Sequence, residues 1–174
     1  MSLFGADRLE GMSDLTTEAH EAVRLIIGGR WAALASHGDR GPLASMVSYA
    51  AEPGLTGMTM FLSRLARHTR NLEQQASGSL VISLPDRPEV LDPQTLPRVS
   101  VQGIVVAIER TDPAFAPAWQ THIERLPAVA PRLQLGDFTL FRLIPDEARY
   151  VGGFGAARTI RGDALRQAAI DLAN

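Results

Sequence analysis

A cationic segment with hydroxyl and amide side chains, residues 63–71, is the part of the sequence best suited to chemistry. Four of its nine residues are basic and three carry a hydroxyl or amide group. The segment follows an apolar run typical of a strand and continues as a helix, so free backbone N–H groups and the positive end of the helix dipole favour an anion there. Arginine adds charge-assisted hydrogen bonds. The pattern predicts a phosphate site, with a solvated basic helix face as the alternative.

The composition excludes several other kinds of site. The chain has no cysteine, which excludes disulfides, thiolate metal sites, iron–sulfur clusters and cysteine nucleophiles. All 17 of its Lys and Arg residues are arginine, so no lysine can hold pyridoxal phosphate as a Schiff base. The four histidines are His20, His37, His68 and His122, and they show neither HxH nor HxxxH spacing. A histidine metal centre is therefore not expected.

Length and charge limit the class of protein. A chain of 174 residues predicts one domain over 1–174, with its core at about 14–160. The net charge of −2 argues against nucleic acid as a partner. No apolar run reaches the roughly 18–20 residues that span a bilayer. No secretory signal is apparent at the N-terminus, so a cytoplasmic location is expected.

Hydrophobic spacing predicts the elements that position the cationic segment. Helical spacing occurs at about 14–27, 65–75 and 163–172, and a further helix should begin at Asp112-Pro113 and pack Trp119 and His122. Strand patterns occur at 31–36, 42–51, 58–62, 79–84, 98–109, 137–144 and 148–151, the last two separated by a turn at Pro145-Asp146. The mostly hairpin-connected order predicts an α+β, mostly β fold, a six- to seven-stranded antiparallel split β-barrel with peripheral helices.

The strand at 44–49 is a second candidate for ligand contact. Alternation places Ser45, Val47 and Tyr49 on one face and Met46 and Ser48 on the other. Such a strand can offer backbone groups to the edge of a flat heteroaromatic ring. A half-buried strand with no ligand would show the same alternation.

Four motifs in order resemble the pyridoxamine 5′-phosphate oxidase-like FMN-binding split-barrel superfamily, and its haem-utilisation branch in particular. They lie at residues 42–49 (PLASMVSY), 61–72 (FLSRLARHTRNL), 98–103 (RVSVQG) and 152–157 (GGFGAA). The resemblance covers about residues 20–160, and its most specific part is the cationic segment.

This resemblance implies a homodimer that binds FMN in a groove at the subunit interface. The flavin ring and ribityl chain would contact Ser45, Met46 and Val47, and the ribityl and phosphate would meet Ser63, Arg64 and Leu65. The phosphate oxygens would be held by Arg67, His68, Thr69 and Asn71. Arg98 and Gln102 share a face of their strand, and either could reach the flavin.

The function implied is that of a flavoprotein, an FMN-dependent oxidoreductase on a small-molecule substrate, with no nucleic-acid or membrane partner. The flavin would supply the electron chemistry, which suits a chain without an evident acid–base constellation. True pyridoxamine phosphate oxidases have lysine where His68 stands, which disfavours that specific activity. A non-catalytic flavin carrier is one alternative.

A haem-binding or haem-degrading protein on the same barrel is the other alternative. Relatives with that activity carry a further C-terminal segment that supplies an axial histidine, whereas residues 163–174 contain no His, Met, Tyr or Cys. The iron ligand would have to come from one of the four histidines, Tyr49 or Tyr150.

Overall fold

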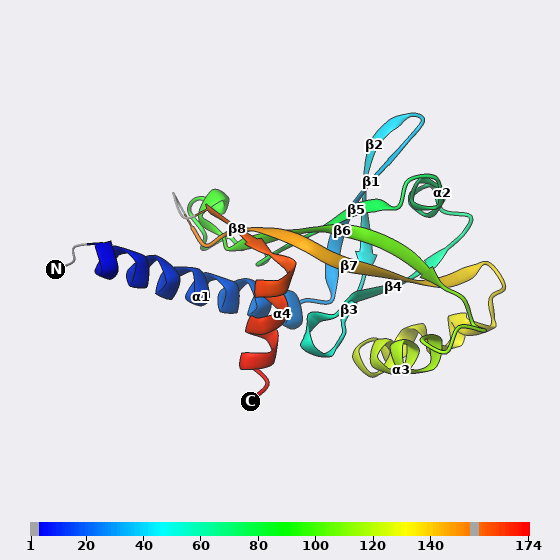
Figure 1. The fold of residues 1–174 in the computed structure, drawn as a ribbon. Coiled ribbons are helices and arrows are strands. Elements are labelled where there is room, and N and C mark those ends of the chain that lie inside the picture. The colour runs from blue at the N-terminus through cyan, green and yellow to red at the C-terminus, as the bar shows by residue number, and fades with distance from the viewer. Residues whose placement is uncertain (1–3, 154–156) are drawn as a thin grey trace.

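The computed structural model describes residues 4–153 and 157–174. Within these residues the chain forms one eight-stranded antiparallel sheet that curls on itself, with four α-helices around it (Figure 1). The strand order is β2-β1-β5-β6-β7-β4-β3, and β8 pairs with the end of β7. The predicted α+β split barrel is confirmed.

The elements lie close to the predicted ranges. The strands are β1 (Trp31–Gly38), β2 (Gly41–Ser48), β3 (Ala50–Ala51), β4 (Met58–Ser63), β5 (Ser77–Ser83), β6 (Arg98–Ile108), β7 (Phe138–Val151) and β8 (Ala157–Arg161). The helices are α1 (Phe4–Gly28), α2 (Arg67–Gln74), α3 (Phe115–Arg125) and α4 (Gly162–Asp171). Short 3₁₀ segments occupy Pro53–Leu55, Pro93–Thr95 and Pro127–Gln134. The helix predicted from residue 14 begins earlier, at Phe4, and the helix predicted from Asp112 begins later, at Phe115.

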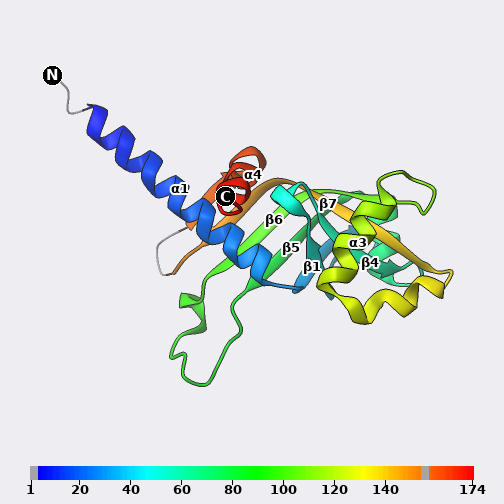
Figure 2. The same ribbon diagram turned by 90° about the horizontal axis from the view of Figure 1, so that it is seen from below.

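Alternating side chains of the strands build the core. On β1 the side chains of Ala32 and Leu34 are buried, whereas Trp31 and Ala35 on either side of this pair are exposed. Val23 and Ile26 of α1 pack into the same core from outside the sheet. Burial of each large apolar side chain of this kind stabilises the folded state by roughly 1.5–3 kcal/mol. Figure 2 shows α1 and α4 side by side, and the two helices are in contact.

The predicted turn at Pro145-Asp146 is wrong, because β7 runs unbroken through these residues. Opposite them, Gln102 of β6 pairs with Glu147 while Gly103 pairs with Pro145, so Asp146 is an extra residue in the ladder. This is a β-bulge, where a proline without an N–H group is tolerated. A Cβ atom on Gly103 would clash with the carbonyl oxygen of Ile144, which explains the glycine.

The predicted count of six to seven strands was too low, because β8 was missed and β3 was predicted as the end of the strand at 42–51. β3 has only two residues, too few to show an alternation. In β8 only Ile160 is buried, and its neighbours Arg158 and Thr159 are exposed and polar.

Over the residues with described structure, no helix is long and apolar enough to cross a membrane.

Candidate functional site

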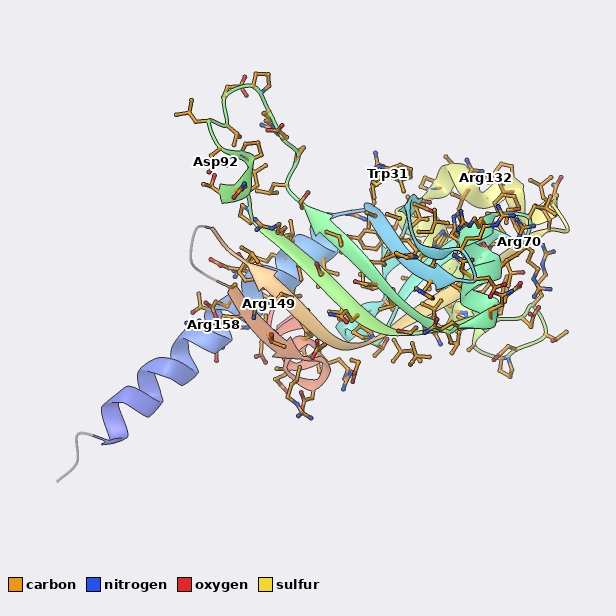
Figure 3. The ribbon with its side chains drawn as sticks, turned by 90° about the horizontal axis from the view of Figure 1, so that it is seen from above. Trp31, Arg70, Asp92, Arg132, Arg149 and Arg158 are labelled. Carbon is orange, nitrogen blue, oxygen red and sulfur yellow. The ribbon has the colours of Figure 1, made fainter. Side chains whose placement is uncertain are left out.

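The junction between β4 and α2 carries the cationic segment, and we call residues 63–71 the cationic junction. β4 ends at Ser63, and α2 begins at Arg67 with Ala66 as its N-cap residue. Ala66 provides no side-chain cap, so no side chain at the N-cap accepts from the first N–H groups of α2. The side chains of Arg67 and Arg70 are exposed, and Arg70 is labelled on α2 in Figure 3. An uncapped helix start with two exposed arginines attracts an anion.

The inner side of the cationic junction is fastened to the sheet. Asn71 is buried, and its Nδ2 donates to Ser36 Oγ on β1 at 3.2 Å. Thr69, in the first turn of α2, is 0% exposed, and its Oγ1 has no hydrogen-bond partner among the described residues. A buried hydroxyl without a hydrogen-bond partner destabilises the folded state by roughly 1–3 kcal/mol. A ligand with acceptor oxygens would remove that cost if it reached Thr69.

His68 is half-buried beside these residues. Burial lowers the pKa of its imidazole below the usual 6.5. At neutral pH the ring is therefore mainly neutral and donates through one N–H group. A dianion bound nearby would favour the charged imidazole and raise that pKa again.

The start of the cationic junction is tied to acidic residues of the same chain. Ser63 Oγ donates to Asp137 Oδ2 at 2.5 Å and accepts from the Leu65 N–H at 3.1 Å. The Arg64 guanidinium lies 2.6 Å from Glu109 Oε1, and its Nε lies 3.6 Å from the Glu73 carboxylate. Two of the predicted contact residues, Ser63 and Arg64, therefore already have partners within the chain, and the side chain of Leu65 is exposed.

Among the described strands, β2 lies at one end of the sheet order and pairs with β1 alone. Its outer backbone N–H and C=O groups therefore have no strand partner. The predicted alternation holds, because Val47 is buried, Ser45 is half-buried and Met46 is exposed. α2 contacts β1 and, less extensively, β2, so the cationic junction lies beside the β1–β2 hairpin.

Arg98 lies away from the cationic junction. It begins β6, pairs with Ser83 and donates from Nη1 to the carbonyl oxygens of Gln94 at 2.8 Å and Leu96 at 3.3 Å. α2 packs at the opposite end of β5, where Leu72 lies against Gly78, roughly 17 Å along the strand from Ser83. One copy of the chain therefore does not bring Arg98 to the cationic junction.

Gln102 is exposed on the outer face of β6, paired with Ser79 of β5. The last predicted motif, at residues 152–157, is described only in part, because 154–156 lie outside the described residues.

Two possible iron ligands are inaccessible. His122 is 0% exposed, its Nδ1 lies 2.8 Å from Thr59 Oγ1, and its ring stacks on Trp119. Burial lowers the pKa of His122 to about 4, so the ring is neutral. Tyr49 is also fully buried and donates to the Ile26 carbonyl oxygen at 2.7 Å. Both side chains belong to the core, as was predicted for His122.

No sequence pattern indicates a large apolar groove of about 1010 Å³ that the structure forms. Its lining comes from the C-terminal part of α1, the start of β1, the end of β5 and the segment that follows it, with Met46 and Tyr150 added. Tyr150 OH donates to Glu21 Oε2 at 2.9 Å, and burial together with Glu21 raises the pKa of Tyr150 to about 12. Because these segments are far apart in sequence, no local motif marks the groove. We call it the apolar groove.

Known proteins share this fold and part of the sequence. The chain matches the family described as "CREG, beta-barrel" over residues 13–166. It is 32% identical over 110 residues to the heme oxygenase HutZ of Vibrio cholerae, which covers 63% of this chain and 62% of that protein. The structure of a heme binding protein from Mycobacterium smegmatis matches with a TM-score of 0.75 at 28% identity, over 86% of this chain and 60% of that one. The chain thus spans about 60% of the length of these relatives.

Two further structures carry different names on the same fold. The crystal structure of HutZ, named a heme storage protein, matches with a TM-score of 0.62 at 26% identity, over 75% of this chain and 89% of that one. A Clostridium acetobutylicum protein of the pyridoxinephosphate oxidase family matches with a TM-score of 0.64 at 13% identity. The match covers 86% of this chain and 98% of that one. The second likeness shows the fold alone.

Proposed function

The chain belongs to the CREG beta-barrel family, and we propose that within it this protein is a flavoprotein that binds FMN at the cationic junction. The observation that carries the proposal is the start of α2, which is uncapped and bears Arg67 and His68. It lies beside the β1–β2 hairpin, and β2 has an unpaired edge where a ring could meet backbone groups. A phosphate and a flat heteroaromatic ring joined by a short chain match these two features.

The residues present fit the phosphate of FMN. The first N–H groups of α2 and the Arg67 guanidinium are donors, and His68 adds a ring N–H. Thr69 adds a buried hydroxyl that lacks a partner among the described residues. The outer edge of β2 offers further backbone donors and acceptors to the ring, at Met46 and at Ala44 and Ser48 on either side of it.

FMN would supply electron-transfer chemistry, which the side chains of this protein do not provide by themselves. The role of the chain is then to hold the phosphate through Arg67 and the helix start, and to orient the ring along β2. We therefore propose a flavin-dependent oxidoreductase acting on a small molecule. A flavin carrier would bind FMN equally well but would not be turned over by NAD(P)H or oxygen.

A second copy of the chain is proposed to cover the outer face of the sheet. This face exposes apolar side chains on four strands, and exposed apolar patches mark interaction sites. They are Met46, Val81, Ile104, Val106 and Ile144. Gln102 lies on the same face, so a homodimer would place it at the interface together with the cofactor.

Haem binding is the second candidate function. The names of HutZ and of the M. smegmatis protein, both above 25% identity, state a heme function, and the apolar groove is large enough for an extended ring system. No histidine lines that groove. Because His122 and Tyr49 are 0% exposed, the iron ligand would fall to His20, His37, His68 or Tyr150, which is 4% exposed and lines the apolar groove.

Comparison of FMN with riboflavin tests the proposed phosphate site. Riboflavin has the same ring and ribityl chain without the phosphate. We expect FMN to bind on the order of a hundredfold more tightly, because the phosphate makes several charge-assisted hydrogen bonds. Flavin fluorescence titration of the purified protein measures both affinities, and light scattering should give twice the chain mass. Equal affinities for the two flavins would contradict a phosphate site at the cationic junction.

A further inference from the structure

His122 is a buried titratable side chain that the FMN proposal does not use. We propose that it is a pH-sensitive latch, which holds α3 on the sheet while its imidazole is neutral and releases α3 when the ring takes up a proton. This inference goes beyond the proposed function, because it requires no flavin. Its basis is the hydrogen bonding of the two ring nitrogens and the packing around the ring.

The two ring nitrogens of His122 are in different environments. Nδ1 lies 2.8 Å from Thr59 Oγ1 on β4, and that hydroxyl donates to the Ala50 carbonyl oxygen of β3 at 3.3 Å. Because the hydroxyl proton is used there, Nδ1 carries the ring proton and donates to Thr59. Nε2 is then a bare acceptor, and it is buried without a hydrogen-bond partner among the described residues. A second ring proton, on Nε2, would have no acceptor.

The ring of His122 is closed off from water. Its exposure is 0%, as is that of Thr59. Trp119 stacks on the ring with centroids 5.9 Å apart, and the Phe61 ring approaches it edge-on with centroids 6.5 Å apart. A charged imidazole in this position loses its hydration. His122 lies in the last turn of α3, where the helix dipole favours a cation, but burial outweighs that effect and lowers the pKa of the imidazole to about 4.

Among the described residues, no charged group compensates a second proton on His122. β3 and β4 contain no ionisable side chain. Arg142 of β7 pairs with Thr59 across the ladder, but its guanidinium lies 2.6 Å from the Glu52 carboxylate, which neutralises it. Tyr49, next to β3, is neutral because burial raises its pKa. The other ionisable side chains of α3 and of the 3₁₀ segment packed on it are exposed to solvent, and they are Glu124, Arg125 and Arg132.

α3 is a unit that can leave while the main core stays closed. It packs beside β3 and β4 (Figure 1) on an apolar cluster of its own, to which the sheet contributes Phe61, Ile108 and Leu140. The main core cluster, as described, contains no residue of α3. Arg125 also fastens the helix, with Nη2 2.7 Å from the Gly28 carbonyl oxygen at the end of α1. Units with few buried contacts open before the rest of a protein.

Proton uptake sets the pH range of the release. An imidazole freed from the core has its usual pKa of 6.5, whereas in the closed state the pKa of His122 is about 4. Closed α3 therefore binds fewer protons than released α3, so its closure is unaffected by pH above 6.5. Between the two pKa values, each unit of acidification shifts the equilibrium about tenfold toward release. The latch is closed at neutral pH and weakens in acid.

Hydrogen exchange followed by mass spectrometry tests the latch in the wild-type protein. After correction for the intrinsic exchange rate, we expect the protection of the α3 amides to fall about tenfold per pH unit from roughly pH 6 to 4.5. The amides of β5 and β6 should stay protected over the same range. Loss of protection in all three elements together would overturn the proposal, because the acid would then unfold the whole chain.

The variant His122→Phe tests whether His122 is the group that titrates. It keeps an aromatic ring against Trp119 but takes up no proton. Its α3 amides should lose a constant amount of protection, from the missing bond to Thr59, and show no further fall with pH over this range. The matched control His37→Phe removes an exposed histidine of β1 and should follow the wild-type pH dependence. The same pH dependence in both variants would overturn the proposal. The wild-type exchange decides the question even if His122→Phe does not fold.

The emission of Trp119 gives a second readout. The chain has two tryptophans, and Trp31→Phe removes the exposed one, so the remaining emission reports on the stack with His122. In this background we expect a red shift on acidification, as Trp119 becomes hydrated. The shift should be absent over the same pH range when His122→Phe is added. A red shift of equal size at the same pH in both proteins would contradict the latch.

Discussion

Replacing Arg67 and His68 together with alanine is expected to weaken FMN binding by about 3 kcal/mol, on the order of a hundredfold. Both side chains lie at the uncapped start of α2, where each adds a donor to the phosphate. A charge-assisted hydrogen bond contributes roughly 1.5–3 kcal/mol, and we take the lower value because Arg67 is exposed to solvent. Titration by flavin fluorescence measures the change.

The matched control is Arg132→Ala/His37→Ala, which removes the same two residue types from exposed positions on other elements. Its FMN affinity should equal that of the wild type. Riboflavin should bind the Arg67→Ala/His68→Ala variant as it binds the wild type, because it lacks the phosphate. Unchanged FMN affinity in that variant would remove the cationic junction as the phosphate site.

Replacing Gly103 with alanine is expected to lower the free energy of unfolding by about 3 kcal/mol. The added Cβ would collide with the carbonyl oxygen of Ile144, a backbone atom that cannot move without shifting β7. The bulge between β6 and β7 would have to open, in the longest strand pair of the sheet. The same change would displace Gln102, the adjacent residue on the outer face.

Urea denaturation measures this effect, since the free energy of unfolding falls linearly with urea concentration. Gly136→Ala is the control, because a Cβ there has no atom within 4 Å. The control should change the free energy of unfolding by no more than about 0.5 kcal/mol. Equal midpoints for the two variants would mean that the bulge does not require glycine.

The sheet could be predicted because burial follows alternation on most strands. Ala32 and Leu34 of β1 show it in the sequence, and the structure buries both. The bulge at Asp146 could not be predicted, since Pro145-Asp146 is also typical of a turn, and only pairing with β6 distinguishes the two. β8 was missed because a strand that buries Ile160 alone has no apolar alternation to detect.

The candidate site could be predicted in its position but not in its partners. The residue types at 63–71 predicted the strand-to-helix junction, which the structure forms with Ala66 as an N-cap residue that makes no side-chain cap. The partners of Arg64 and Ser63 are Glu109 and Asp137, which are distant in sequence and become neighbours only in the folded sheet. Whether the residues named here hold FMN stays a prediction.

The apolar groove shows the same limit of sequence reasoning. Arg24, Trp31 and Leu84 come from a helix, a strand and a loop, and each looks like an ordinary surface residue in its own segment. Only their juxtaposition reveals a wall of apolar side chains. A groove of this kind has no motif, because its spacing is set by the fold.

The absorbance spectrum of the purified protein, followed during titration first with FMN and then with haem, tests the central claim most directly. The account predicts flavin bands that saturate at one FMN per chain, and no shifted Soret band when haem is added. A shifted Soret band together with no saturable flavin binding would contradict it. Haem binding would then become the function to pursue, with His20, His37, His68 and Tyr150 as the residues to replace.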